Sequence, residues 1–142
     1  MVYWDASALV ALCIEEETTE PLRRLLAGGI VTWAVSRVEI ASAIERRSRE
    51  KDFSPEARRD ALAALDQLAG AWTEIQAVAP VCERATRLLA THQLRAADSM
   101  QLAAALVAVA DRPGGHDFVC ADHRLREAAG REGFRVLPES LS

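Results

Sequence analysis

Carboxylic acids stand where expected strands end, and their spacing suggests shared chemistry. Asp5 directly follows the β-prone run at residues 2–4, and Asp122 directly follows the apolar run at residues 118–121. Because the ligand crevice of an open parallel sheet lies outside the carboxyl ends of its strands, we expect both acids at the same edge. Asp117 precedes its strand, so we expect it at the opposite edge, although only five residues separate it from Asp122.

Two further acids are expected on inward-facing surfaces of helices. Asp98 lies one turn before Leu102 on the apolar stripe of its helix, and Glu39 lies one turn from both Val35 and Ala43. An inward-facing acid is unfavourable unless its charge is compensated, and converging carboxylates raise each other's pKa values. A divalent cation resolves both problems, since hard cations such as Mg²⁺ prefer a few carboxylates plus water.

Each acid also has a purely structural interpretation. Asp5 and Asp122 can cap the helices that follow their strands. Glu39 can complete a capping box with Ser36 at the start of its helix, and the helix dipole alone favours Asp98. Because two acids share a sheet edge and two share inward helix faces, the set as a whole favours a metal site.

The elements that must position these acids predict an α/β fold. The expected strands cover residues 2–4, 30–33, 72–78, 118–121 and 134–137. The expected helices cover residues 6–14, 19–27, 36–51, 55–70, 80–92, 97–111 and 124–132. Strands that alternate with helices imply a parallel sheet sandwiched by helices. We find no internal repeat or Ser/Gly-rich linker, so residues 1–142 are expected to form a single domain.

Composition and charge exclude several classes of protein. The net charge is −4 and the pI about 5.4, whereas domains that coat nucleic-acid phosphates usually have a pI above ~9. Bound metal ions can nevertheless supply positive charge locally. There is no apolar run of ~18 residues, no secretory signal pattern and no paired cysteine spacing. We therefore expect a cytoplasmic protein that does not enter a membrane.

The scarcity of lysine discriminates among acidic sites at a sheet edge. Haloacid-dehalogenase-like phosphatases and phospho-accepting receiver domains both need a lysine in the site. Lys51 is the only lysine in this chain, and it lies in a polar helix. A metal-dependent phosphodiesterase needs none, because its carboxylates hold one or two Mg²⁺ or Mn²⁺ ions that activate a water. The sequence therefore favours metal-dependent hydrolysis.

Four short stretches occur in a characteristic order and spacing. They are Asp5-Ala6-Ser7-Ala8-Leu9, Ser36-Arg37-Val38-Glu39, residues 92–105 around Asp98, and Phe118-Val119-Cys120-Ala121-Asp122 with the residues that follow to Gly133. With them the chain resembles the PIN-domain ribonucleases, specifically the VapC-type toxins of toxin–antitoxin pairs, over about residues 1–138. The third and fourth stretches in this spacing are the specific part of the resemblance.

The resemblance implies a set of site residues. The catalytic and metal-binding quartet would be Asp5, Glu39, Asp98 and Asp122. The Ser7 hydroxyl would orient Asp5, and Ser36 would play a similar positioning part. Cys120 departs from the family, which often has a hydroxyl residue two positions before the last acid, so a contact beside that acid is left open.

The resemblance also implies an activity and partners. Members of the family use Mg²⁺ or Mn²⁺ to cut RNA, commonly a tRNA or an rRNA loop, leaving a 5′-phosphate and a 3′-hydroxyl. Many form homodimers and are silenced by a cognate antitoxin, for which the helices at residues 19–27 and 36–51 would form a groove. Arg95 and Arg124, beside the acidic motifs, are candidate contacts to the RNA phosphates.

Two other functions remain open from the residues alone. The same fold can serve as a catalytically inactive interaction module whose acidic pocket is only a docking surface. The presence of all four acids argues against that interpretation. A structure-specific DNA nuclease is the second alternative, because nothing but the resemblance separates RNA from DNA as the substrate.

Overall fold

Five short strands form one parallel sheet in the computed structural model, which describes residues 1–141. They are β1 (Val2–Trp4), β2 (Val31–Trp33), β3 (Thr73–Ile75), β4 (Asp117–Val119) and β5 (Arg135–Leu137). Their order in the sheet is β3-β2-β1-β4-β5, and every neighbouring pair is parallel. The carboxyl ends of all five strands therefore meet at one edge, which confirms the predicted α/β fold.

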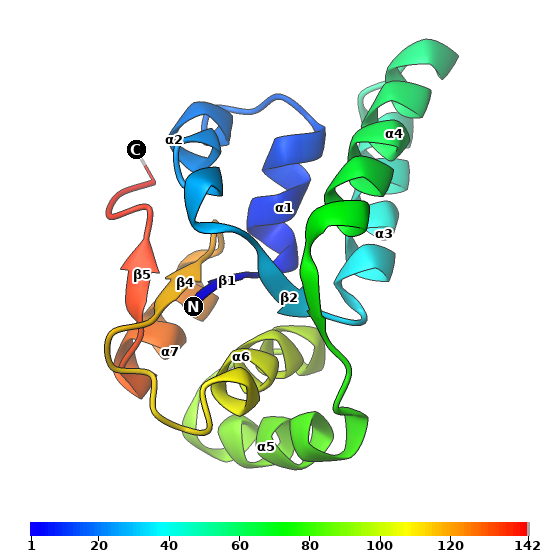
Figure 1. Ribbon diagram of the computed structural model, residues 1–142. Helices are drawn as coiled ribbons and strands as arrows, with labels where there is room; N and C mark the ends of the chain where they lie inside the picture. The colour runs from blue at the N-terminus through cyan, green and yellow to red at the C-terminus, as the bar shows by residue number, and fades with distance from the viewer. Residues whose placement is uncertain (142) are drawn as a thin grey trace.

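Helices cover both faces of the sheet, as Figure 1 shows. They are α1 (Ala6–Cys13), α2 (Thr19–Arg23), the 3₁₀ turn η1 (Leu26–Gly28), α3 (Ser36–Glu50), α4 (Pro55–Ala71), α5 (Val78–Thr91), α6 (Ala96–Ala108) and α7 (His123–Glu132). Trp4 and Val119 pack in one apolar cluster with α1, α3 and α4, whereas Tyr3 and Phe118 pack in another with α5, α6 and α7. Successive strand residues point to opposite faces, so the two central strands anchor both layers.

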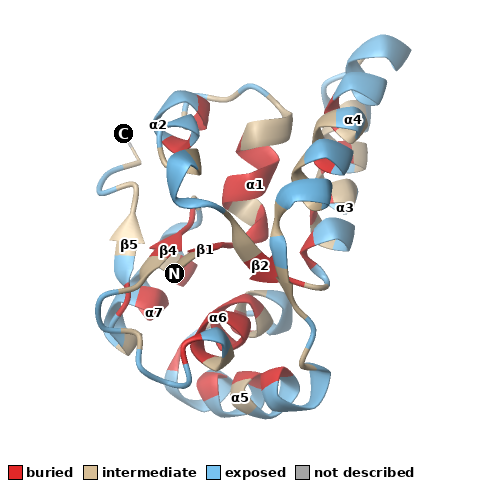
Figure 2. Cartoon of the chain, in the orientation of Figure 1, coloured by how far each residue is buried: buried red, intermediate tan, exposed pale blue. Residues whose placement is uncertain are grey.

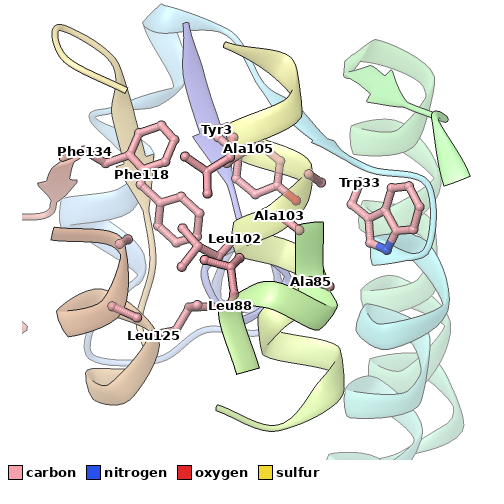
Figure 3. Close-up of a cluster of buried hydrophobic side chains, with 14 of the residues drawn as sticks. Tyr3, Trp33, Ala85, Leu88, Leu102, Ala103, Ala105, Phe118, Leu125 and Phe134 are labelled. Atoms are coloured by element: carbon pink, nitrogen blue, oxygen red, sulfur yellow. The ribbon is translucent and has the colours of Figure 1, made fainter. Parts of the chain in front are cut away.

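The cluster between the sheet and α5–α7 contains a stacked and a tilted pair of aromatic rings (Figure 3). The rings of Tyr3 and Phe118 stack with centroids 5.3 Å apart, and Phe134 lies 5.6 Å from Phe118. Fully burying a side chain such as Phe118 contributes roughly 1.5–3 kcal/mol to folding. Figure 2 shows that buried residues gather where helices face the sheet, while the end of α4 that projects from the body is exposed.

The start of α3 differs from the prediction. Val35, not Ser36, is the N-cap, and no side chain caps the helix. Ser36 is the first helical residue, and its hydroxyl is buried against Thr32 and Gln101. The predicted capping box with Glu39 is therefore wrong, because tertiary hydrogen bonds claim both side chains.

Several predicted boundaries also shift. The expected helix at residues 19–27 is divided into α2 and η1, and the expected strand at 72–78 is only Thr73–Ile75. Helix α6 ends before Pro113, because Ala110 and Asp111 adopt φ values of 52° and 62° that a right-handed helix does not allow. Asp117 is the first residue of β4 and does not precede it. Within residues 1–141, no helix is long and apolar enough to cross a membrane.

Candidate active site

Asp5 is held rigidly at the carboxyl end of β1. It is the N-cap of α1, its backbone is extended, and its Oδ1 accepts a hydrogen bond from the Ala8 amide at 3.2 Å. Its own amide donates to the Val119 carbonyl of β4 at 3.1 Å. Only 2% of Asp5 is exposed. The cap and the sheet therefore fix an acid in a nearly dry environment.

Ser7 joins Asp5 to the loop after β4. Its hydroxyl lies 2.8 and 2.9 Å from the two carboxylate oxygens of Asp5 and accepts a hydrogen bond from the Ala121 amide at 3.0 Å. Because the hydroxyl donates to Asp5, the serine is placed to orient that carboxylate. The same contact brings the loop that leads to Asp122 close to β1.

Asp98 and Asp122 line one hollow at the same edge of the sheet. Asp98 lies half-buried in the first turn of α6, and Asp122 is the exposed N-cap of α7, accepting from the Leu125 amide at 2.9 Å. The hollow has a volume of about 380 Å³ and also includes Arg95. Burial raises the pKa of Asp98, Asp122 raises it further, and Arg95 opposes the shift.

Glu39 is held by a hydrogen bond from Gln101, a residue that the sequence analysis did not identify. Gln101 of α6 is 1% exposed, and its Nε2 donates to Glu39 Oε2 at 3.1 Å. The hydroxyl of Tyr3 donates to Gln101 Oε1 at 2.7 Å. The other oxygen of Glu39 is buried and has no hydrogen-bond partner among residues 1–141. Gln101 follows Asp98 by three residues on one helix face, and that spacing is the signal that could have found it.

A chain of hydroxyls continues this network to β1. Gln101 Nε2 donates to Ser36 Oγ at 3.0 Å, Ser36 and Thr32 lie 2.7 Å apart, and Thr32 Oγ1 donates to the Trp4 carbonyl at 2.7 Å. Because Thr32 donates to Trp4, Ser36 donates to Thr32 and accepts from Gln101. Ser36 thus acts on Glu39 through Gln101. No periodicity marks Thr32, a polar residue inside a short strand.

The carboxylates influence one another electrostatically. Burial is the main cause that raises the pKa of Asp5 to about 6; hydrogen bonds from Ser7 and Ala8 oppose it, and Asp98 adds to it. Burial likewise raises the pKa of Glu39 to about 7, and both Asp5 and Asp98 contribute. Four acids from four elements therefore share one electrostatic environment at the carboxyl edge of the sheet.

Cys120 occupies the position where a hydroxyl was expected. It is fully buried after β4, its Sγ accepts from the Asp122 amide at 3.4 Å, and it lies 3.8 Å from Ser7 Oγ. Burial raises the pKa of the thiol well above its ordinary value. The side chain is therefore a neutral contact between the loop of Asp122 and Ser7.

Asp117 lies apart from these acids. It begins β4, pairs with Val2 and Arg135 in the sheet, and forms a two-pronged ion pair with the Arg135 guanidinium at 2.7 and 3.0 Å. The parallel sheet places it at the amino edge, as the order of strand and acid in the sequence predicts.

The donor set fits a hard divalent cation. Within the part of the chain that the structure describes, no three His, Cys, Asp or Glu side chains are already gathered around one point. Mg²⁺ usually binds through only one or two carboxylates and keeps several waters. The unpartnered oxygen of Glu39 and the raised pKa values of Asp5, Glu39 and Asp98 mark negative charge that lacks compensation. A cation at this edge would supply the missing positive charge.

Comparisons with known proteins agree with this geometry. The family model for the PIN domain matches residues 2–131. The chain is 35% identical over 146 aligned positions to Ribonuclease VapC45 of Mycobacterium tuberculosis strain CDC 1551 / Oshkosh and, to the same degree, to Ribonuclease VapC49 of strain ATCC 25618 / H37Rv. Each alignment covers 99% of this chain and 97% of the relative.

Proposed function

The chain belongs to the PIN-domain family and to its VapC-type ribonucleases, and we propose that it hydrolyses RNA with Mg²⁺ or Mn²⁺ held by Asp5, Glu39, Asp98 and Asp122. As a VapC-type protein it is the endoribonuclease toxin of a toxin–antitoxin pair. The observation that carries the metal assignment is that burial raises the pKa values of Asp5, Glu39 and Asp98, and that a neighbouring acid adds to each of these shifts.

Some of these residues would bind the ion, and others orient the residues that bind it. Asp5 and Asp98 would bind the principal ion, with Glu39 and Asp122 completing the site directly or through water. When bound, the cation supplies Lewis acidity to the scissile phosphate and to the attacking water. Ser7 keeps the Asp5 carboxylate in one orientation, and Gln101 does the same for Glu39.

The two nucleophilic side chains beside the acids, Ser7 and Cys120, have structural roles in this proposal. The Ser7 hydroxyl donates its hydrogen to Asp5 and accepts from the Ala121 amide. The Cys120 thiol stays neutral, because burial raises its pKa. Water is the attacking group in this proposal, and hydrolysis would leave a 5′-phosphate and a 3′-hydroxyl, as the family resemblance implies.

The test is cleavage of RNA by the purified full chain. We expect cleavage with Mg²⁺ or Mn²⁺, none after chelation, and none by Asp98→Asn. The matched control is Asp60→Asn, which removes an exposed acid of α4 and should cleave like the wild type. Undiminished cleavage by Asp98→Asn would refute the metal assignment, and cleavage of DNA with RNA left intact would favour a DNA nuclease.

The antitoxin surface is proposed on α2, η1 and α3, the elements that the structure has at the helices predicted for residues 19–27 and 36–51. Val35 and Val38, beside Glu39, are 39% and 67% exposed and can receive apolar anchors of a partner helix. An arginine of the antitoxin would then reach the uncompensated acids. Co-expression with the small protein encoded next to this one should give a stable complex that Val38→Asp weakens. Separate elution of the two wild-type proteins, with toxicity unchanged, would contradict the proposal.

Self-association is proposed separately. The resemblance predicts a homodimer, and light scattering of the purified chain without antitoxin checks it. A mass of one chain across the concentration range would contradict the dimer without affecting the metal site.

A further inference from the structure

Two hollows with shared lining residues lie at and next to the carboxylates. The first, of about 380 Å³, contains Asp98 and Asp122. The second, of about 360 Å³, lies between α7 and the segment that joins α5 to α6. Both are lined by Gln93, Leu94 and Arg124, so they form one furrow that leads away from the acids. We call it the Arg124 furrow.

The charges along the Arg124 furrow are unevenly compensated. Within residues 1–141, Glu127 forms an ion pair with Arg131 at 2.6 Å. Glu132, next to the furrow, lies with its Oε2 atom 2.6 Å from His92 Nε2. Arg124 is exposed, and no ion pair or hydrogen bond engages its guanidinium in the described part of the chain. The second hollow therefore offers one free positive group, in a protein whose net charge is −4.

The shape of the furrow suits an unpaired nucleotide. Its second hollow, of about 360 Å³, lies near the lower end of the ~300–1,000 Å³ typical of small-molecule sites, a size that suits a single nucleotide. A guanidinium is the group that best matches the paired oxygens of a phosphate. Leu94, half-buried in the wall, offers apolar surface of the kind on which a base can rest.

We propose that the Arg124 furrow binds the nucleotide adjoining the scissile phosphate of a single-stranded RNA, with Arg124 on its phosphate. The proposal rests on the proposed ribonuclease function and adds a substrate contact outside the four acids. The acids of the first hollow repel RNA unless a cation is present, so the neighbouring arginine also supplies attraction that does not depend on the cation.

The test measures binding of a short fluorescent single-stranded RNA of mixed sequence to the full chain carrying Asp98→Asn. Adding Arg124→Ala should weaken binding about tenfold and reduce the slope of log affinity against log salt by ~0.7, the value for one phosphate contact on a single strand. Arg124→Lys should keep the salt slope of the parent and bind more tightly than Arg124→Ala but less tightly than the parent. Lysine keeps the positive charge but lacks the planar guanidinium that can donate two parallel hydrogen bonds to a phosphate.

A matched control separates this contact from a general loss of charge. Arg59→Ala removes an exposed arginine of α4 that has no ion pair within residues 1–141, and it should leave affinity and slope unchanged. Equal losses in Arg59→Ala and Arg124→Ala would overturn the proposal, as would an Arg124→Ala slope identical to that of its parent.

Cleavage kinetics distinguish failure of this inference from failure of the proposed function. With Asp98 intact, Arg124→Ala should raise KM while the Mn²⁺ concentration needed for half-maximal activity stays unchanged. An unchanged KM would overturn the furrow and leave the ribonuclease function standing. Absence of cleavage by the wild type would instead refute the function on which the furrow rests.

Discussion

Replacing Asp5 by asparagine should stabilise the metal-free protein at pH 8 and change it little at pH 5. Asp5 is 2% exposed, and burial raises its pKa from 3.8 to about 6. The folded chain therefore holds this proton more tightly than the unfolded chain does. The resulting stability is complete below the unfolded pKa and is lost as the pH rises through about 6.

The magnitude follows from the same two pKa values. A tenfold difference in proton affinity corresponds to about 1.4 kcal/mol, so the charged form of Asp5 destabilises the fold by about 3 kcal/mol above pH 7. Asparagine keeps an oxygen for the Ala8 amide but weakens the bond with Ser7, which offsets ~1 kcal/mol. We expect a net gain of about 2 kcal/mol, or ~5–10 °C in Tm for a chain of this size.

Calorimetry at the two pH values, in the presence of a chelator, measures this effect. At pH 8, excess Mg²⁺ should raise the Tm of the wild type and leave Asp5→Asn almost unchanged; at pH 5 the wild type should respond weakly, because metal ligands must be deprotonated. Asp60→Asn, on exposed α4, should behave like the wild type. If Asp5→Asn destabilises the protein equally at both pH values, the buried charge is already compensated within the chain and the reasoning fails.

Three further substitutions and one control probe how the site is held. Gln101→Leu leaves the Tyr3 hydroxyl and Glu39 without their hydrogen-bond partner. The free energy of unfolding should therefore fall by ~1–3 kcal/mol, and kcat should fall with it. An unchanged kcat would contradict a positioning role for Gln101. Ser7→Ala frees the Asp5 carboxylate and should lower kcat ~10–100-fold while the secondary structure, measured by circular dichroism, is retained. Asp122→Asn should weaken Mn²⁺ binding and lower kcat by a similar ~10–100-fold. The kcat of Asp117→Asn, at the opposite edge, should stay within a few-fold of the wild type. A metal titration in which Asp117→Asn binds Mn²⁺ more weakly than Asp122→Asn would discredit the topology.

The position of the acids relative to the strands was predictable from the sequence. In a parallel sheet, the order of strand and acid along the chain decides the edge, and it separated Asp122 from Asp117. The apolar neighbours of Asp98 likewise indicated its inward face. These arguments need only the chain direction and the helical period, both of which are local properties.

The support beneath the acids was not predictable in the same way. Gln101 and Thr32 are neutral polar residues inside apolar elements, and only tertiary packing brings them their partners on α3 and β1. Ser36 has the local pattern of a helix cap, but tertiary hydrogen bonds draw its hydroxyl inward. Helix α6 ends before left-handed Ala110 and Asp111. Aspartate adopts that conformation more readily than most residues, but alanine gives no such signal.

The most direct test of the central claim is the position of Mn²⁺ in crystals of the full chain, located by its anomalous scattering. We expect a peak whose nearest protein atoms are carboxylate oxygens of Asp5 and Asp98, within ~2.5 Å, and no peak in crystals of Asp98→Asn grown under the same conditions. A wild-type chain that cleaves RNA with Mn²⁺ but binds the ion away from these acids would contradict the claim.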